Sequence, residues 1–382
     1  MPLLFENARL VDLDGERPGW LLVDGDTITA TGTGSAPDEV TAAAAERIDV
    51  AGAWLAPGFI DLHGHGGGGF AFDDGPESIR AALATHRAHG TTRSVISLVA
   101  NPLDTLTASL RTVAELVASD PLILGSHLEG PYLAVRRRGA HAQEFLIAPD
   151  AEVDARLLEA ANGTLRQITI APELEGALES IDRYTAAGAV VAIGHTEVDY
   201  ETARQAFAHG ARLLTHAYNA MPGIHHRDPG PLVAAFDDPN VAVELVADGI
   251  HVHPGVLEMT FRAAPNRIVL VTDAMAAAGS AEGFYSIGSL NVVVKEGRAV
   301  LNGTDTLAGS TLTLDVALRT AIVAAQTAPA DAVAALTSTP ARVLGLDDRL
   351  GRLAPGFAAD LVVLDDEWTV DAVWARGERV PV

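Results

Sequence analysis

The sequence contains no cysteine. This absence excludes disulfide bonds and thiolate ligands, so any bound metal must be held by histidine, aspartate or glutamate. Long uncharged apolar runs are also missing. None approaches the roughly 18 residues of a membrane span, and Glu6, Arg9 and Asp12 interrupt the N-terminal stretch. We therefore expect a cytoplasmic protein that does not associate with a membrane.

Positive charge is scarce, with 26 basic against 50 acidic residues and a formal net charge of -24. Such a balance repels nucleic acid and anionic lipid, so neither is an expected partner. The one dense basic run, Arg136 to Arg138, is interpreted as a solvated loop, with steering of an anionic substrate as the lesser alternative. The hydrophobic content of 48% is that of a folded protein.

Both ends of the chain read as short strands joined by Gly and Asp turns. The stretch "LAPGF" occurs at 55–59 and again at 353–357, near the two junctions with the middle of the chain. Isolated pieces of two or three strands cannot bury enough surface alone. We therefore predict that residues 1–54 and 350–382 meet in one small β-sandwich domain.

Between these ends, apolar strand-like runs alternate with Ala-rich helical stretches. The eight runs are "GFIDLHGH", "RSVISLVA", "LILGSHLEG", "RQITIAPE", "VVAIGHT", "RLLTHAYN", "VAVELVAD" and "RIVLVTDA". Eight such runs favour an α/β fold, a (β/α)8 TIM-type barrel, over residues 55–349. The segment "YSIGSLNVVVKEGRAVLNG" indicates a β-hairpin insertion near 285–303.

Six polar side chains fall at or just past the carboxyl ends of these runs. They are His63, His65, Glu129, His195, His216 and Asp273. In a βα barrel the strand ends converge on the face that carries the active site. We therefore expect these groups to surround one centre, with Gly66–Gly69 letting the following loop bend around a ligand.

Each of these residues also has a structural interpretation. The pair His63 and His65 would form hydrogen bonds in many folds, a single interior histidine is common, and Asp273 could cap a helix. A carboxylate such as Glu129 at the end of an apolar run is costly to bury unless it is paired or bound to a cation. The joint occurrence favours a metal site.

Imidazole and carboxylate ligands suit zinc, with iron(II) and manganese as alternatives. A bound cation lowers the pKa of a water molecule toward about 7, and a nearby carboxylate can take the proton. Asp273, on the last predicted strand, is the candidate for that role. The pattern therefore predicts metal-assisted hydrolysis.

Seven segments extend this interpretation to a family. They are "PGFIDLHGHGGGG", "HLEGPYL", "GHTEVDY", "THAYNAMPGIHHRDPG", "ADGIHVHP", "VTDAM" and "LAGSTLTLD". In this order, and over nearly the whole chain, the sequence resembles the N-acetylglucosamine-6-phosphate deacetylases of the amidohydrolase superfamily. The resemblance implies a βα barrel beside a small β-sandwich built from both termini.

The resemblance also implies roles for the candidate residues. Glu129, His195 and His216 would form the principal metal site. His63 and His65 would contribute to a second metal that Glu129 bridges and Asp273 approaches, so one or two divalent ions are expected per subunit. Asp273 would act as general base and acid, and His141 would polarise the acetyl carbonyl.

For the substrate, the resemblance implies phosphate contacts from His251 and Arg227, with Arg227 reaching across from a neighbouring subunit of a homodimer. A sugar pocket would be completed by Asn219, Ala220 and the segment Leu307, Ala308, Gly309 and Ser310. The sequence assigns no role to His225 and His226, and His253 has a structural alternative.

The implied reaction removes acetate from N-acetyl-D-glucosamine 6-phosphate, giving D-glucosamine 6-phosphate in amino-sugar catabolism or recycling. A rival within the superfamily is a hydrolase of another amide, such as an N-acyl-amino acid or a cyclic amide. A carbamylated-lysine enzyme is disfavoured, because "TIAPE" at the fourth strand end contains no lysine and Lys295 lies in the hairpin. A non-catalytic relative would have lost metal ligands that this sequence retains.

Overall fold

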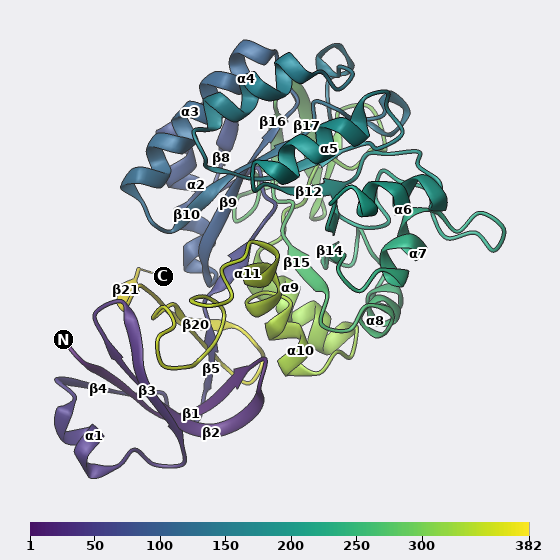
Figure 1. Ribbon diagram of the computed structural model, residues 1–382. Helices are drawn as coiled ribbons and strands as arrows, with labels where there is room; N and C mark the ends of the chain where they lie inside the picture. The colour runs from purple at the N-terminus through teal and green to yellow at the C-terminus, as the bar shows by residue number, and fades with distance from the viewer. Residues whose placement is uncertain (382) are drawn as a thin grey trace.

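Eight parallel strands form one sheet in the computed structural model, which describes residues 1–381 (Figure 1). Each predicted apolar run overlaps one strand, which confirms the α/β barrel. The strands, in sheet order, are β6 (Phe59–Asp61), β9 (Thr91–Val99), β10 (Ile123–Glu129), β11 (Leu165–Ile170), β12 (Val190–Ile193), β13 (Leu213–Leu214), β14 (Ala242–Val246) and β15 (Ile268–Val271).

Helices connect successive barrel strands. They are α2 (Pro76–Ala88), α3 (Leu103–Ser119), α4 (Ala151–Ala161), α5 (Ala177–Ala186), α6 (Tyr200–Ala208), α7 (Gly230–Asp237) and α8 (Pro254–Ala263). After the last barrel strand come α9 (Leu314–Arg319), α10 (Pro329–Ala334) and α11 (Ser338–Val343). Local sequence sets several of their starts. The Asp150 side chain accepts hydrogen bonds from two backbone amides at the start of α4, and Asp199 caps α6 in the same way.

The two ends of the barrel sheet, β6 and β15, are joined by side-chain and backbone hydrogen bonds near Asp61 and Thr272. The carboxylate of Asp61 accepts hydrogen bonds from the Thr272 hydroxyl at 2.6 Å and from the Thr272 amide at 3.2 Å. The Asp273 amide also donates to the His63 carbonyl at 2.8 Å. Barrel closure therefore brings the segment of His63 directly beside that of Asp273.

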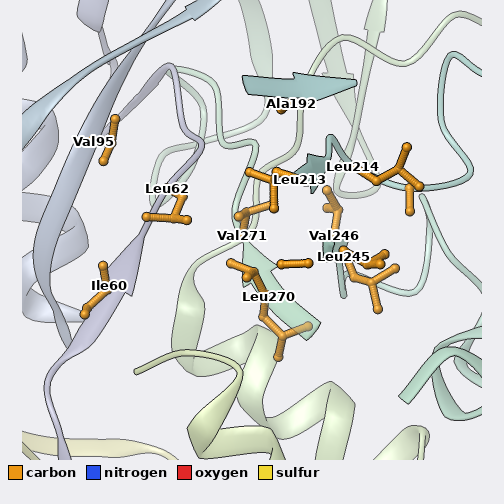
Figure 2. Packing of buried hydrophobic residues seen from close by; sticks show 14 of the residues in the cluster. Ile60, Leu62, Val95, Ala192, Leu213, Leu214, Leu245, Val246, Leu270 and Val271 are labelled. Atoms are coloured by element: carbon orange, nitrogen blue, oxygen red, sulfur yellow. The ribbon is translucent and has the colours of Figure 1, made fainter. Parts of the chain in front are cut away.

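The main hydrophobic core lies between the barrel strands and their helices. Figure 2 shows part of it, with side chains from β6, β9, β12, β13, β14 and β15 and from Leu62 just past β6. These side chains are wholly or almost wholly buried. Burial of each large aliphatic group stabilises the fold by about 1.5–3 kcal/mol, so the strand ends are held on a rigid scaffold.

Both chain termini contribute to a second, mostly antiparallel sheet at one end of the barrel (Figure 1). Its strands are β1 (Leu3–Asp12), β2 (Gly15–Asp24), β3 (Thr27–Thr33), β4 (Glu46–Asp49), β5 (Trp54–Pro57), β19 (Leu361–Leu364), β20 (Val370–Ala375) and β21 (Glu378–Val380). The short helix α1 (Asp38–Ala43) precedes β4.

This sheet folds over on itself. The rings of Phe5 on β1 and Trp374 on β20 meet edge to face at 4.9 Å, although β5 and β19 separate the two strands. Neighbouring strands lie about 4.8 Å apart, so a flat sheet would hold these rings roughly 14 Å apart. The curved sheet encloses its own apolar cluster, as a small β-sandwich does.

The segment expected as a hairpin near 285–303 forms three antiparallel strands: β16 (Gly283–Ile287), β17 (Leu290–Lys295) and β18 (Arg298–Leu301). The two "LAPGF" stretches differ in structure. The first overlaps β5 (Trp54–Pro57), which pairs within the terminal sheet, whereas residues 353–357 are not in a strand. The division into 1–54 with 350–382 and 55–349 stays a prediction. Within residues 1–381, no helix has the length and apolar character needed to cross a membrane.

Candidate active site and metal centre

The six predicted ligands converge at the carboxyl ends of the barrel strands. Glu129 is the last residue of β10, and His63 and His65 follow β6. Three others occupy equivalent positions, each two residues past its strand and each with a left-handed backbone: His195 (φ 49°), His216 (φ 24°) and Asp273 (φ 47°). Such strain at non-glycine residues is costly and gathers at functional sites, where the surrounding fold enforces it.

Glu129 lies at the centre of the cluster. Its Oε1 is 2.9 Å from Nε2 of His195 and 3.1 Å from Nε2 of His216, and those two nitrogens are 2.9 Å apart. Ligand atoms around a tetrahedral zinc ion, at about 2.0–2.1 Å from the metal, lie roughly 3.3 Å from one another. The three groups therefore fit one cation.

A second group lies on the other side of Glu129. The Nε2 atoms of His63 and His65 are 3.2 Å apart, and Oδ1 of Asp273 is 3.7 Å from the first and 3.4 Å from the second. Glu129 lies 3.4 Å from His63 and 3.3 Å from His65, through different carboxylate oxygens. Its carboxylate thus lies between two sets of donors, as a bridging ligand would.

Outer hydrogen bonds fix the imidazoles in the form that a cation needs. The Nδ1 atom of His195 lies 2.8 Å from the carbonyl oxygen of Arg137, and Nδ1 of His63 lies 3.2 Å from the Glu244 carboxylate. Because these oxygens only accept, each Nδ1 carries the proton and each Nε2 can present a lone pair to a metal. These hydrogen bonds to Nδ1 are an independent observation that a metal fits here.

The carboxylates and imidazoles of the cluster shift one another's pKa values. Burial opposes ionisation of Glu129 and Asp273, but the neighbouring histidines, His63 among them, hold both carboxyl pKa values well below their usual range. Burial likewise opposes protonation of His65, yet the carboxylates of Asp273 and Glu129 raise its pKa to about 9. A divalent cation would replace the protons on these imidazoles, so metal binding and proton release are coupled.

His141 also contacts Glu129, with Nε2 at 3.1 Å from Oε2, but its other nitrogen differs from those of the ligands. The backbone amide of Ala100 donates to Nδ1 of His141 at 3.3 Å. In the neutral ring the proton must then lie on Nε2, which makes this nitrogen a hydrogen-bond donor. His141 is therefore suited to donate a hydrogen bond rather than to bind a metal.

The glycine run after His65 is hydrogen-bonded and closely packed, whereas the sequence suggested a loop that bends around a ligand. The amides of Gly68 and Gly69 donate at 2.7 Å to the carbonyls of Ala278 and Ala276. A Cβ atom on Gly67 would lie 2.7 Å from the His86 ring, and one on Gly68 would lie 2.2 Å from a hydroxyl of α2. Close packing, not flexibility, requires these glycines.

A cavity of about 400 Å³ opens above the cluster. Of the predicted substrate residues, those lining it are His141, Asn219, Ala220, His251, Leu307 and Gly309. Ala308 is fully buried behind the wall, in the small core beneath β16–β18. The Ser310 amide donates to the Asp273 carbonyl at 2.7 Å, so the "LAGS" segment holds Asp273 in place.

Arg227 does not reach the cavity of its own chain. It lies on the exposed loop Gly223–Asp228, between β13 and α7, which projects from the body of the molecule (Figure 1). Its guanidinium is 2.7 Å from the ring of His226. The second predicted phosphate contact, His251, lines the cavity and is held by Asp248 at 2.6 Å. Although burial disfavours the charged ring, Asp248 raises the pKa of His251.

The residues to which the sequence analysis gave no catalytic or binding role make structural contacts. His253 caps α8 by accepting from the Gly255 amide at 3.1 Å. His225 accepts from the amide of Arg227 at 3.4 Å within the projecting loop. Arg136 and Arg137 border the cavity, although the Arg136 side chain is 83% exposed, as expected of a solvated loop. The carbonyl oxygen of Arg137 lies 2.8 Å from Nδ1 of His195.

Several buried polar residues beneath the cluster escaped the sequence analysis. Glu244 on β14 contacts His63, and Gln167 on β11 donates to Glu244 at 2.8 Å. His127 on β10 lies between the hydroxyls of Ser97 and Thr169, each 2.9 Å away, and burial holds its pKa well below the usual value. In the sequence, the feature that could have identified these residues is a polar residue inside an apolar strand. His127 lies two residues before Glu129 and therefore on the same strand face.

A nearly closed parallel βα barrel with imidazoles and carboxylates gathered at its strand ends defines a hydrolase of the metal-binding barrel type. Residues 54–380 match the amidohydrolase family model, and the chain belongs to this family. That superfamily is typically dependent on divalent metals, and the groups described above could hold them.

Relatives of known name extend over most of the chain. An Escherichia coli O157:H7 protein named N-acetylgalactosamine-6-phosphate deacetylase is 39% identical over 85% of this chain and 87% of its own length. N-acetylglucosamine-6-phosphate deacetylase from Bos taurus is 37% identical over 88% of this chain and 85% of its own length. These identities place the chain beside two sugar-phosphate deacetylases.

Solved structures agree. A mutant of N-acetyl-D-glucosamine-6-phosphate deacetylase from Mycobacterium smegmatis, in complex with N-acetyl-D-glucosamine-6-phosphate, is 40% identical with a TM-score of 0.94. The match covers 100% of this chain and 99% of that one. The enzyme of the same name from Pasteurella multocida is 27% identical, with a TM-score of 0.93 over 99% of each chain.

Proposed function

We propose that this protein hydrolyses the acetamide of N-acetyl-D-glucosamine 6-phosphate to D-glucosamine 6-phosphate and acetate, in amino-sugar catabolism or recycling. The carrying observation is the cavity in which Asp273, His141 and the Glu129 cluster face one space. Similarity to deacetylases over most of the chain supports the same substrate class.

Two zinc ions are the proposed cofactors. Glu129, His195 and His216 would hold the first, and His63, His65 and Asp273 would hold the second. Iron(II) or manganese would suit the same donors. When bound, the cations supply Lewis acidity toward the acetyl carbonyl and the attacking water.

The protein side chains then handle the protons. Asp273 lines the same cavity as His141 and Glu129, and as a carboxylate it can accept a proton from the attacking water. The Nε2–H of His141 donates to the acetyl oxygen as negative charge develops there. Asp273 next gives its proton to the sugar nitrogen, the C–N bond breaks, and acetate and the free amine leave.

The phosphate is bound by His251 of the same chain and by Arg227 of a neighbouring one. His251 carries more positive charge than an ordinary histidine, because Asp248 raises its pKa even though burial lowers it. Arg227 is exposed on a projecting loop and absent from its own cavity, which supports a homodimer in which this loop enters the partner's site. The planar guanidinium matches phosphate oxygens in pairs.

Asn219, Ala220, Leu307 and Gly309 contact the sugar in this proposal. Ala308 acts from behind the wall by packing. Nucleic acid and membranes are not proposed partners, and a cytoplasmic location stays a prediction.

The test is an acetate-release assay with four substrates: N-acetylglucosamine 6-phosphate, unphosphorylated N-acetylglucosamine, an N-acyl-amino acid and a cyclic amide. Strong preference for the phosphorylated sugar supports the proposal. Turnover of the amino-acid or cyclic amide instead would assign a different amidohydrolase activity. Absence of turnover in the zinc-loaded protein would favour a non-catalytic relative.

N-acetyl-D-galactosamine 6-phosphate is the second candidate substrate, because the Escherichia coli O157:H7 relative carries that name. The two sugars differ only in the orientation of the C4 hydroxyl. Comparing kcat/KM for both sugar phosphates decides between them, since a site that hydrogen-bonds one epimer leaves polar groups unpaired with the other.

A further inference from the structure

Glu244 is a fully buried carboxylate in the middle of the apolar strand β14. A buried charge is strongly unfavourable unless hydrogen bonds or ion pairs compensate it. Three donors surround it. Oε1 accepts from Gln167 at 2.8 Å, and Oε2 accepts from Nδ1 of His63 and from the His216 backbone amide, each at 3.2 Å.

Glu244 makes different contacts with the two groups of ligands. Glu244 contacts the imidazole of His63 but only the backbone of His216, so the ring of His216 is not oriented by it. The ring of His195 is oriented separately, by the Arg137 carbonyl. Glu244 therefore acts directly on a ligand ring of one centre alone.

The contact with His63 selects one tautomer. A carboxylate only accepts, so the proton of the neutral imidazole lies on Nδ1 and the lone pair on Nε2, which faces His65 at 3.2 Å. Without this acceptor, the ring would be free to carry its proton on Nε2 or to rotate. Either change would remove a donor from the second centre.

We infer that Glu244 is the positioning residue that sets the cation affinity of the centre formed by His63, His65 and Asp273, and that it affects the centre of Glu129, His195 and His216 less, because there it holds only the backbone of His216. This inference rests on the proposed two-metal site. Its readout is metal content, so it can fail while the deacetylase activity stands.

Two variants remove the contact in different ways. Glu244→Leu replaces the carboxylate by an apolar group of similar size, whereas Glu244→Asp keeps the charge but draws it back by one methylene. Gln167→Leu is the matched control, because it removes another buried polar partner of Glu244 and leaves the contact with His63. If Glu244→Leu does not fold, Glu244→Asp decides.

Glu244→Gln tests the tautomer argument. Its new amide can keep an oxygen toward His63 and turn its NH2 group toward Gln167, whose Oε1 has no partner within residues 1–381 and can accept after an amide flip. A residue needed only to fill space would show no such ranking among the leucine, aspartate and glutamine variants.

The experiment titrates the metal-free proteins with zinc ions and locates the bound zinc by anomalous diffraction. Wild type and Gln167→Leu should bind two ions per chain. Glu244→Leu and Glu244→Asp should retain the ion at His195 and His216 and bind the one at His63 and His65 about 10- to 100-fold more weakly, with Glu244→Gln closer to wild type.

Equal affinity of both centres in every variant would overturn the inference, as would loss of both ions together in the Glu244 variants. A wild-type chain that takes up one zinc ion would also overturn it. In that event acetate release by the one-zinc protein would still support the proposed function, so the two failures are distinguishable.

Discussion

The Thr272 hydroxyl donates to the Asp61 carboxylate across 2.6 Å, and this contact joins the first barrel strand to the last. Asp61 is buried, and burial raises the pKa of its carboxyl group. The residues that follow on the two strands include His63 and Asp273. This hydrogen bond therefore contributes both to closure of the barrel and to alignment of the site, beside the backbone bonds from Asp273 to His63 and from His65 to Ala274.

We expect Thr272→Val to lower the free energy of unfolding by about 1–3 kcal/mol, because a buried carboxylate loses a donor. Urea unfolding measures this change. Thr91→Val is the matched control, since the buried Thr91 hydroxyl has no partner within the described chain. Equal losses in the two variants would show that the Asp61 contact contributes nothing beyond packing.

Asp273→Asn should reduce kcat for acetate release by about 10²- to 10⁴-fold, because an amide cannot accept and return the proton. Zinc content must be measured alongside, since Asp273 also lies among the donors. Near-normal turnover in a protein that retains its metal would remove Asp273 from the proposed mechanism.

Arg227→Ala should lower kcat/KM for the phosphorylated sugar by about 10- to 100-fold through a higher KM, because it removes charge-assisted hydrogen bonds. The unphosphorylated sugar is the control substrate and should be unaffected. An equal effect on both sugars would assign Arg227 a structural role in its loop.

Mixing Arg227→Ala chains with Asp273→Asn chains tests whether Arg227 acts in the partner's site. A mixed dimer would contain one site with both native residues, so random exchange should restore about one quarter of wild-type activity. Mixtures that remain inactive after subunit exchange, checked by native mass spectrometry, would place Arg227 in its own chain's site or outside both.

The pair His89 and Asp315 should make stability depend on pH. The hydrogen bond to Asp315, 3.0 Å long, raises the pKa of His89 above 6.5, and this contribution is lost as pH rises through the higher value. Burial opposes ionisation of Asp315, but His89 lowers its pKa below 3.8, so its contribution is lost in acid. The pair therefore stabilises the fold most between these limits.

We expect His89→Asn to cost about 0.5–1 kcal/mol near pH 5.5 and less near pH 8.5, a small value because solvent screens the partly exposed histidine. Urea unfolding at both values provides the measurement. A loss of unfolding free energy that does not change with pH would mean that the ion pair contributes nothing to stability.

The sequence predicted the barrel and the convergence of the six candidate residues, for a physical reason. His195 and Asp273 end apolar runs, and in a parallel barrel all such ends lie on one face. What it could not supply was side-chain contact across strands. Glu244 stands in "VAVELV" like any polar interruption of a strand, and only the fold shows that His63 lies above it.

Two local expectations needed correction by packing. Four glycines in a row suggested freedom, but Gly67 and Gly68 are required because α2 passes too close for a Cβ atom. The predicted hairpin is a three-stranded sheet, because "GRAVL" pairs again with β17. The proximity of the helix cannot be read from the glycine run alone, because α2 lies further along the chain. The second pairing is local, since only Glu296 and Gly297 separate β17 from β18.

The folded-over terminal sheet constrains the order in which the molecule is made. β5 lies between β1, synthesised at the start, and β19, synthesised more than 300 residues later. During synthesis on the ribosome, one edge of β5 therefore stays unpaired until the whole catalytic barrel has been made. Exposed strand edges attract other chains, so nascent molecules of this protein should be most prone to aggregate just before translation ends.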